Sequence, residues 1–371
     1  MRHFNFLISV LVLLSLACAL TGALMPAPVL TIETATGTSS PPEAEAASPA
    51  GQPTRPVPPT SGQASPSGKD DSSCGNGVCE GPENAQNCPA DCSLTPNPLS
   101  SPESPPKEGG ESGAYRVTNP ASGVSLAVYV SKPADAGDAR LPTVVLVPGG
   151  LSDSAQFRTP RGEAAILAQA GYLVVVFDAD GRGQSAGQED YNGFSHQDGL
   201  AAVIEFSASL PHADPQRIAL VSYSYGITMA SGALARHPDL PVKFLIDWEG
   251  PANRDDTGGC DGAGLGHLKQ VASCDDEAFW AQREASTFIG QIRVPYQRIQ
   301  SEEDHVQPDN GHAILMINNA VAGGVPWVRL NDLPPNQMYD PSNPPAMLPE
   351  SQARLLPQLM LKYLKKMFAL Q

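Results

Sequence analysis

A serine in a sharp turn is the residue of this sequence best suited to covalent chemistry. The apolar run Arg217 to Val221 leads directly into Ser222-Tyr223-Ser224-Tyr225-Gly226, and a helical pattern follows through Arg236. A strand, a tight turn and a helix in this order expose the hydroxyl of the central serine, and small residues two positions before and after it let the turn approach its neighbours. The pattern predicts that Ser224 is a nucleophile; a plain serine in a strand-to-helix loop is the alternative.

Two further glycine-rich segments follow apolar runs that have the length of buried strands. Pro148-Gly149-Gly150 follows the run 143–147, and Asp178-x-x-Gly181-x-Gly183-x-Ser185-x-Gly187 follows the run 173–177. With the Ser224 turn, these segments resemble the oxyanion loop and the Asp-x-Arg-Gly-x-Gly-x-Ser-x-Gly loop of α/β-hydrolases, above all of the esterase and acyl-peptidase branches. Asp180 stands where that branch often has arginine. Neither a phosphate-loop lysine nor a complete dinucleotide fingerprint competes with this resemblance.

The resemblance covers residues 114–371 and implies an α/β-hydrolase fold, with a mainly parallel eight-stranded sheet flanked by helices. The alternation of strand and helix patterns along the chain agrees with that architecture. Strands are expected at 115–119, 125–131, 143–147, 173–177, 217–221, 242–246, 296–299 and 327–330, the first two as an antiparallel hairpin. Helices are expected at 161–170, 198–210, 312–320 and 350–370, and from the Ser224 turn to residue 236. A loop-rich lid is expected at about 251–290.

The resemblance also implies an acid and a histidine that act on Ser224. In this family a histidine accepts the serine proton and a carboxylate orients the imidazole. The acid is expected after the run 296–299, where Asp304 fits the family spacing. Asp247 or Glu249, at the end of the preceding strand, is the less favoured choice.

The histidine is where the sequence departs from the family pattern. The family places this residue after the last strand, but residues 331–371 contain no histidine. Two histidines lie closer to the expected acid: His305 adjoins Asp304, and His312 begins the next helix. A histidine at a helix start could reach the nucleophile from the side, so His312 is preferred over His305. The alternative is that His312 is an ordinary residue of the first helical turn.

The rest of this chemistry uses backbone groups. The oxyanion donors are expected to be the N–H groups of Tyr225 and of Gly150 or Leu151. The mechanism requires no metal ion and no organic cofactor.

The segment before residue 114 has a different composition from the rest of the chain. Arg2 and His3 precede an apolar stretch of about 15 residues, which suits a signal-peptide core better than a bilayer span. Residues around Cys18 resemble a bacterial lipobox, so lipid anchoring and simple secretion are both open. The expected segments are a signal peptide at 1–23, a Pro/Ser/Thr-rich linker at 24–73, a disulfide-rich module at 74–92, a second linker at 93–113 and the hydrolase domain at 114–371.

The cysteines support export. Seven are present: Cys18, four in the module (Cys74, Cys79, Cys88 and Cys92), and Cys260 with Cys274. The module resembles small Cys-Gly-Asn-Gly-x-Cys-Glu modules of secreted bacterial proteins. Three disulfides are favoured over zinc, and solvated turns are favoured over calcium binding by Glu80, Glu83, Asn87 and Asp91. A bridge between Cys260 and Cys274 would close a loop of about 15 residues.

Charge and composition narrow the classes of function. The net charge of −16 and the pI near 4.7 exclude nucleic acid as a partner, because a polyanion needs a cationic surface. An exported carboxylesterase that acts on a small-molecule or polymer-linked ester through an acyl-Ser224 intermediate is the preferred hypothesis. A peptidase of the dipeptidyl-peptidase or acyl-peptidase type, and a binding protein on a degraded hydrolase fold, are the alternatives.

Overall fold

The computed structural model describes residues 113–262, 267–353 and 355–370. The predicted signal peptide, the disulfide-rich module and nearly all of both linkers lie outside the described residues. No helix in the described ranges is both long enough and apolar enough to cross a bilayer.

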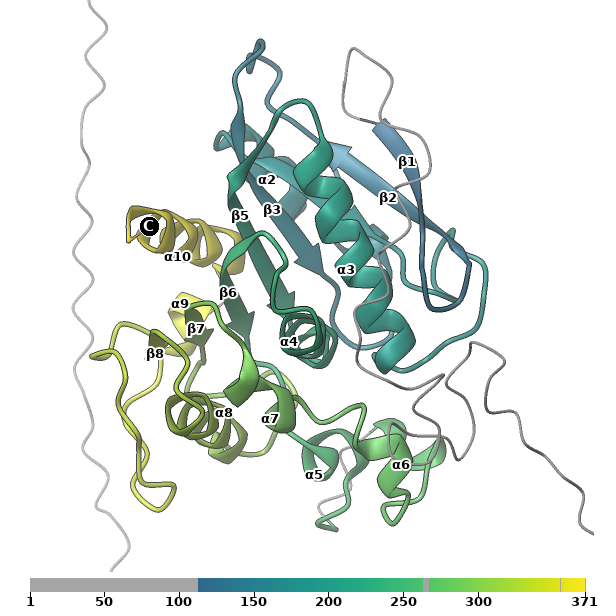
Figure 1. Ribbon diagram of the computed structural model, residues 1–371. Coiled ribbons are helices and arrows are strands. Elements are labelled where there is room, and N and C mark those ends of the chain that lie inside the picture. The colour runs from purple at the N-terminus through teal and green to yellow at the C-terminus, as the bar shows by residue number, and fades with distance from the viewer. Residues whose placement is uncertain (1–112, 263–266, 354, 371) are drawn as a thin grey trace, which may run out of the picture. The chain divides into compact units, whose positions relative to one another are not determined.

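One eight-stranded sheet organises the described part of the chain (Figure 1). The strands are β1 (Gly113–Thr118), β2 (Ser125–Ser131), β3 (Leu141–Val147), β4 (Leu173–Phe177), β5 (Ala213–Tyr223), β6 (Val242–Trp248), β7 (Tyr296–Ile299) and β8 (Val328–Leu330). Their order across the sheet is β1-β2-β4-β3-β5-β6-β7-β8. The first two strands form the predicted antiparallel hairpin, β2 also pairs antiparallel with β4, and all other neighbours are parallel. All eight predicted strands and the predicted fold class are confirmed.

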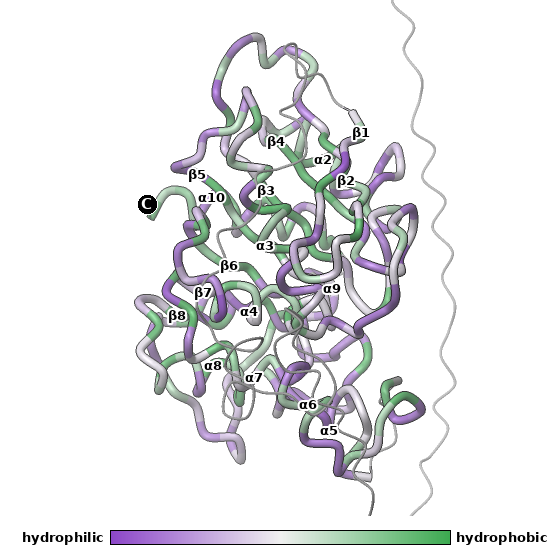
Figure 2. The backbone as a smooth tube through the Cα atoms, turned by 45° about the vertical axis from the view of Figure 1, so that its right-hand side comes forward, coloured by the Kyte–Doolittle hydropathy of each residue, from purple (hydrophilic) through white to green (hydrophobic). Residues whose placement is uncertain are grey.

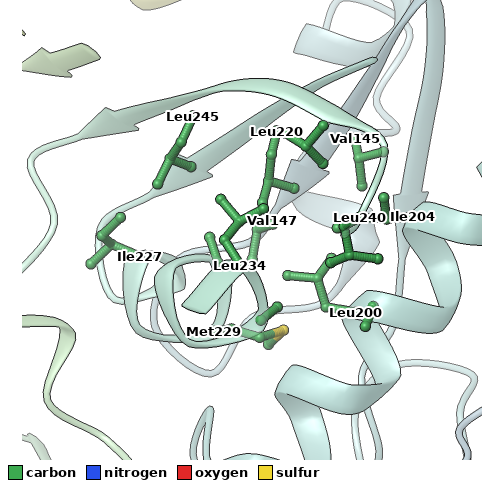
Figure 3. Packing of buried hydrophobic residues seen from close by; sticks show 14 of the residues in the cluster. Val145, Val147, Leu200, Ile204, Leu220, Ile227, Met229, Leu234, Leu240 and Leu245 are labelled. Atoms are coloured by element: carbon green, nitrogen blue, oxygen red, sulfur yellow. The ribbon is translucent and has the colours of Figure 1, made fainter. Parts of the chain in front are cut away.

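The central strands are continuous apolar runs because helices cover both faces of the sheet. Alternate residues of β3 show this: Val145 and Val147 pack on one face, whereas Val144 and Leu146 pack on the other. In Figure 1, α3 (Phe194–Ser209) and α4 (Gly226–Arg236) cover the first face, and α2 (Glu163–Gln169) and α10 (Leu356–Ala369) lie on the opposite side. Figure 2 shows apolar residues following β3, β4 and β5 through the centre, and Figure 3 shows strand and helix side chains meeting on the first face.

Two helices differ from the predictions by more than two residues. Helix α3 begins at Phe194, four residues earlier than the predicted start at 198. The predicted closing helix is broken into α9 (Glu350–Ala353) and α10, which has Pro357 in its first turn. Proline has no N–H to continue a preceding helix but fits the start of a new one, which accounts for the break.

The predicted lid is built from short helices: α5 (Arg254–Gly258), α6 (Glu277–Trp280) and α7 (Ala285–Phe288), with 3-10 turns at His267–Gln270 and Ile289–Gln291. The predicted disulfide between Cys260 and Cys274 is present. Trp280 is fully buried and packs with Leu268 and Tyr225, the residue after Ser224. The disulfide links two parts of this segment, and the apolar cluster packs it against the residue that follows Ser224.

Candidate active site

Ser224 occupies the strained turn that its sequence context predicts. Its φ angle is +50°, a left-handed conformation that residues other than glycine rarely adopt. The Ser224 N–H donates to the carbonyl of Trp248, 2.8 Å away, which ties the turn to the end of β6. A Cβ at Gly226 would lie 2.5 Å from the Pro148 carbonyl oxygen, and a Cβ at Gly149 would lie 3.1 Å from the Cβ of Ser224. Both glycines therefore let the turn and the Pro148-Gly149-Gly150 loop approach each other.

His305 connects Ser224 to a carboxylate. Its Nε2 lies 2.9 Å from the Ser224 Oγ, and its Nδ1 lies 2.9 Å from Oε2 of Glu249. The imidazole stacks on the indole of Trp248, with ring centroids 4.5 Å apart and planes 26° apart. The His305 side chain is 30% exposed and that of Glu249 is 1% exposed. A partly open base thus sits between a serine hydroxyl and a buried acid.

Glu249 is fixed by several donors. Its backbone also has a positive φ of +47°, and its N–H donates to the carbonyl of Ile299 at 3.0 Å. Oε1 accepts hydrogen bonds from the N–H and the hydroxyl of Ser301, and Oε2 accepts one from the N–H of His305 in addition to facing the imidazole. An ionised carboxylate is an acceptor at both oxygens, so these donors suit a charged Glu249 that orients His305.

The predicted oxyanion donors lie next to the serine. The Tyr225 N–H, like those of Gly150 and Leu151, donates to no protein acceptor within the described residues. The neighbouring Gly149 N–H, by contrast, donates to Oε1 of Gln156 at 3.2 Å. The side chain of Tyr225 is held by its hydroxyl, which donates to the carbonyl of Tyr191 at 2.7 Å. The assignment of the oxyanion donors stays a prediction.

The preferred pair of the sequence analysis, Asp304 and His312, is not in the predicted arrangement. The two side chains contact each other, with His312 Nε2 3.3 Å from Asp304 Oδ2. The Nδ1 of His312 faces inward, 3.0 Å from the Gly250 carbonyl oxygen and 3.1 Å from Nη2 of Arg298. Both ring nitrogens of this buried histidine are thus directed at groups other than Ser224. The structure corrects this prediction: His305, the second choice, contacts the serine, and Glu249, a less favoured acid, contacts that histidine.

The sheet order explains the correction. Strands β5, β6 and β7 are parallel neighbours, so residues that follow their carboxyl ends meet at one edge of the sheet. Ser224, Glu249 and His305 follow these three strands in turn. The preference for His312 depended instead on its place at a helix start, and the preference for Asp304 depended on the family spacing.

Asn331 occupies the position after β8 where the family would supply the histidine. Its Oδ1 accepts from the N–H of Gln300 and its Nδ2 donates to the Gln300 carbonyl, each at 2.9 Å. Asn331 thereby extends the pairing of β7 with β8 by one residue. Its role here is structural.

Asp247, the other alternative acid, belongs to a buried ion pair. Its Oδ2 lies 2.7 Å from Nη1 of Arg298 and accepts a hydrogen bond from the hydroxyl of Tyr296 at 2.8 Å. Both charged side chains are inaccessible to solvent. Burial by itself would lower the pKa of Arg298, but the charge of Asp247 raises it well above its usual range. This pair supports the end of β6 and does not face His305.

Glu249, Asp304 and His305 bring oxygen and nitrogen atoms within 4.8 Å of one another. Such a group raises the question of a bound cation. Each carboxylate oxygen already accepts hydrogen bonds from N–H or O–H donors, and Nε2 of His305 faces Ser224. These contacts are those of a hydrogen-bonded histidine. The lone pairs of the carboxylate oxygens and of the ring nitrogen that would bind a cation are already directed at hydrogen-bond partners.

Comparison with known proteins agrees with the fold. Residues 122–256, which include Ser224 and Glu249, match the family model described as X-Pro dipeptidyl-peptidase (S15 family). No curated protein matches the sequence. Similar solved structures include dipeptidyl peptidase 4 of Porphyromonas gingivalis, with 19% identity, a TM-score of 0.50, and 70% of this chain and 35% of that chain covered.

Two archaeal proteins are also similar. An esterase of Pyrococcus furiosus has 18% identity and a TM-score of 0.50, with 70% of this chain and 92% of that chain covered. The acylaminoacyl peptidase of Pyrococcus horikoshii has 19% identity and a TM-score of 0.47, with 59% of this chain and 36% of that chain covered. The chain thus spans about a third of the length of the two peptidases. The sheet order and the two likenesses with a TM-score of 0.50 define an α/β-hydrolase fold, on which the chain carries a serine, a histidine and a glutamate in contact.

Proposed function

We propose that the protein is a serine hydrolase with Ser224 as nucleophile, His305 as general base and Glu249 as the acid that orients it. The observation that carries the proposal is His305, which lies 2.9 Å from Ser224 Oγ through one nitrogen and 2.9 Å from Glu249 through the other. Nucleophile, base and orienting acid within hydrogen-bond reach are the arrangement that activates a hydroxyl.

In the proposed reaction, Ser224 Oγ attacks the acyl carbon while His305 Nε2 takes the hydroxyl proton. Glu249 accepts the Nδ1–H of the resulting imidazolium and stabilises its charge. The N–H of Tyr225, with that of Gly150 or Leu151, holds the oxyanion. His305 then protonates the leaving group, which departs with its electron pair. His305 then takes a proton from a water molecule, which attacks the acyl-Ser224 intermediate. The carboxylic acid product is released, and the Ser224 hydroxyl is restored.

A carboxylic ester, small or polymer-linked, is the proposed substrate. An alkoxide or phenoxide leaves a tetrahedral intermediate more readily than an amine does, so a working serine nucleophile cleaves an activated ester before it cleaves an amide. Peptide hydrolysis requires in addition a subsite that holds the peptide. The match of residues 122–256 to the X-Pro dipeptidyl-peptidase family favours a peptidase as the second candidate.

Two chromogenic substrates test the proposal on the purified full-length chain. Short-chain p-nitrophenyl esters measure esterase activity, and Ala-Pro-p-nitroanilide measures dipeptidyl peptidase activity. Turnover of esters that disappears in Ser224→Ala but persists in Ser342→Ala, a change at an exposed loop serine, supports the esterase. Faster turnover of the anilide supports the peptidase. Turnover of neither by folded protein contradicts both and favours the binding-protein alternative.

We also propose that the protein acts outside the cytoplasm, secreted or tethered to a membrane through lipid on Cys18. The apolar segment at the N-terminus and the disulfide between Cys260 and Cys274 support this, because disulfides persist in oxidising compartments. The mass of the exported chain, compared with that of Cys18→Ser, measures both cleavage and lipidation. An uncleaved chain in the cytoplasmic fraction would contradict the proposal.

A further inference from the structure

A second carboxylate faces the same nitrogen of His305 as Glu249 does. Asp304 Oδ1 lies 3.5 Å from His305 Nδ1, compared with 2.9 Å for Glu249 Oε2. The Asp304 side chain is inaccessible to solvent. Two charges at such a short distance, with little water between them, interact strongly.

Asp304 is held rigidly at that distance. Its Oδ1 accepts hydrogen bonds from the N–H groups of Val306 and Gln307, both at 2.8 Å, which fixes the turn that carries His305. Its Oδ2 accepts from Nε2 of Gln300 at 2.9 Å and faces His312. Burial alone would raise the pKa of Asp304, but the hydrogen bond and charge of His312 outweigh it and, with the other donors, hold this pKa well below its usual range. Asp304 is therefore a carboxylate at neutral pH, as an ordinary aspartate is, and stays ionised further into acid than one.

The charges around the two histidines are unbalanced when both rings are neutral. The contacts around the two histidines join three buried carboxylates, one guanidinium and the two rings: Asp247, Glu249, Asp304, Arg298, His305 and His312. Two negative charges are then left over. Two carboxylates, those of Glu249 and Asp304, therefore lie beside the ring on which the proposed acyl transfer generates an imidazolium.

We propose that Asp304 is a second carboxylate for His305, a positioning residue that acts with Glu249 to orient the ring and to stabilise its imidazolium. This inference rests on the proposed function and adds a residue to it. It also gives Asp304 and His312 a role different from the predicted one: His312 anchors Asp304, and Asp304 acts through His305.

A consequence is that replacing Glu249 alone is expected to abolish only part of the activity. Where an enzyme has one acid behind its histidine, neutralising that acid costs about 10⁴-fold in kcat. With Asp304 present, Glu249→Gln is expected to cost about 100-fold and Asp304→Asn about 10-fold, while the double variant reaches about 10⁴-fold. The double variant then loses more than the product of the single losses, as expected for two groups that share one task.

The experiment measures kcat/KM against pH for p-nitrophenyl butyrate hydrolysis by the full-length chain and these three variants. Glu303→Gln is the matched control, because Glu303 lies on the same loop and is exposed; it is expected to leave both activity and pH profile unchanged. Asp304→Asn is expected to move the acid limb of the profile by about one unit to lower pH, since a charge that favours the imidazolium is gone. A residue that merely holds the loop would lower activity without moving the limb.

A titration of the His305 ring by NMR separates this inference from the proposed function. It is recorded in Ser224→Ala, with and without Asp304→Asn, and does not depend on turnover. A midpoint about one unit lower without the Asp304 charge supports the inference. An unchanged midpoint, or a double variant no slower than Glu249→Gln alone, overturns it. Failure of the proposed function would appear separately, as a wild-type chain without turnover.

Asp304→Asn leaves a buried histidine without its partner and could prevent folding. If circular dichroism shows that it is unfolded, the same titration compares His312→Asn with His312→Asn/Asp304→Asn. That comparison removes the carboxylate after its partner has gone. The same downward shift is expected, and an unchanged midpoint again overturns the inference.

Discussion

Replacing Gly226 by alanine tests whether the close approach of the Ser224 turn to the neighbouring loop matters for activity. The added Cβ would lie 2.5 Å from the Pro148 carbonyl oxygen and 3.0 Å from that of Val147. Both are backbone atoms at the end of β3, so they cannot rotate out of the way as a side chain can. An ordinary contact requires at least 3.4 Å, so the turn and the loop must separate by roughly 1 Å, and overpacking of that kind costs about 1–3 kcal/mol.

The expected loss of activity is larger than the loss of stability suggests. A displacement of about 1 Å between groups that act together costs about 100-fold in rate, and here it separates Ser224 and the Tyr225 N–H from Gly150. Urea unfolding measures the stability of Gly226→Ala, and ester hydrolysis measures kcat/KM. Gly311→Ala is the control, because its Cβ would meet only the Asp309 side chain at the exposed start of α8 (Gly311–Ala322); alanine there is expected to be neutral. Wild-type activity and stability in Gly226→Ala would refute the reasoning.

Three further predictions concern the support of the site. Arg298→Met is expected to destabilise the fold by about 3–5 kcal/mol, because it leaves the buried charge of Asp247 unpaired, and Arg298→Met/Asp247→Asn is expected to recover part of that loss in urea unfolding; equal stability of the two would contradict this. Replacing Cys260 and Cys274 by serine is expected to cost about 3 kcal/mol, as for a closed loop of about 15 residues, and an unchanged unfolding midpoint would count against it. Because the pKa of Asp304 is lowered in the folded protein, its ionisation stabilises the fold above the unfolded-state pKa of about 3.9 and that contribution is lost as pH falls through the folded-state pKa. The stability difference between wild type and Asp304→Asn should therefore be full at pH 6 and shrink below about pH 4; a difference that grows in acid would show the opposite sign.

Most of the fold could be predicted from the sequence because its strands are buried on both faces. Continuous apolar runs such as Leu173–Phe177, bounded by glycine or charged residues, have few other interpretations. The exact helix boundaries could be predicted less well from the sequence. The start of α3 at Phe194 depends on Gly193, which packs against Arg283 of the lid, and a contact across about 90 residues leaves no local pattern in the sequence.

In the candidate site too, one part could be predicted from local sequence and another could not. Ser224 was predictable because its chemistry and its turn lie within five consecutive residues. The choice between His305 and His312, seven positions apart, depends on which ring the loop turns toward the sheet edge. Asp304 determines that direction through hydrogen bonds to the N–H groups of Val306 and Gln307, and Arg298 holds His312 inward from a neighbouring strand. The hydrogen bonds of Asp304 are local, but the contacts of His312 with Arg298 and of His305 with Glu249 are tertiary, and no local pattern in the sequence shows them.

Covalent labelling of Ser224 tests the central claim most directly. The full-length chain is treated with a fluorophosphonate, and the modified peptide is quantified by mass spectrometry in wild type, His305→Gln and His312→Gln. We expect wild type to be labelled at Ser224, His305→Gln to be labelled at least about 10³-fold more slowly because the serine has lost its base, and His312→Gln to be labelled at a reduced but readily measured rate. Labelling of folded His305→Gln at the wild-type rate, or its loss in folded His312→Gln, would contradict the assignment of His305 as the base.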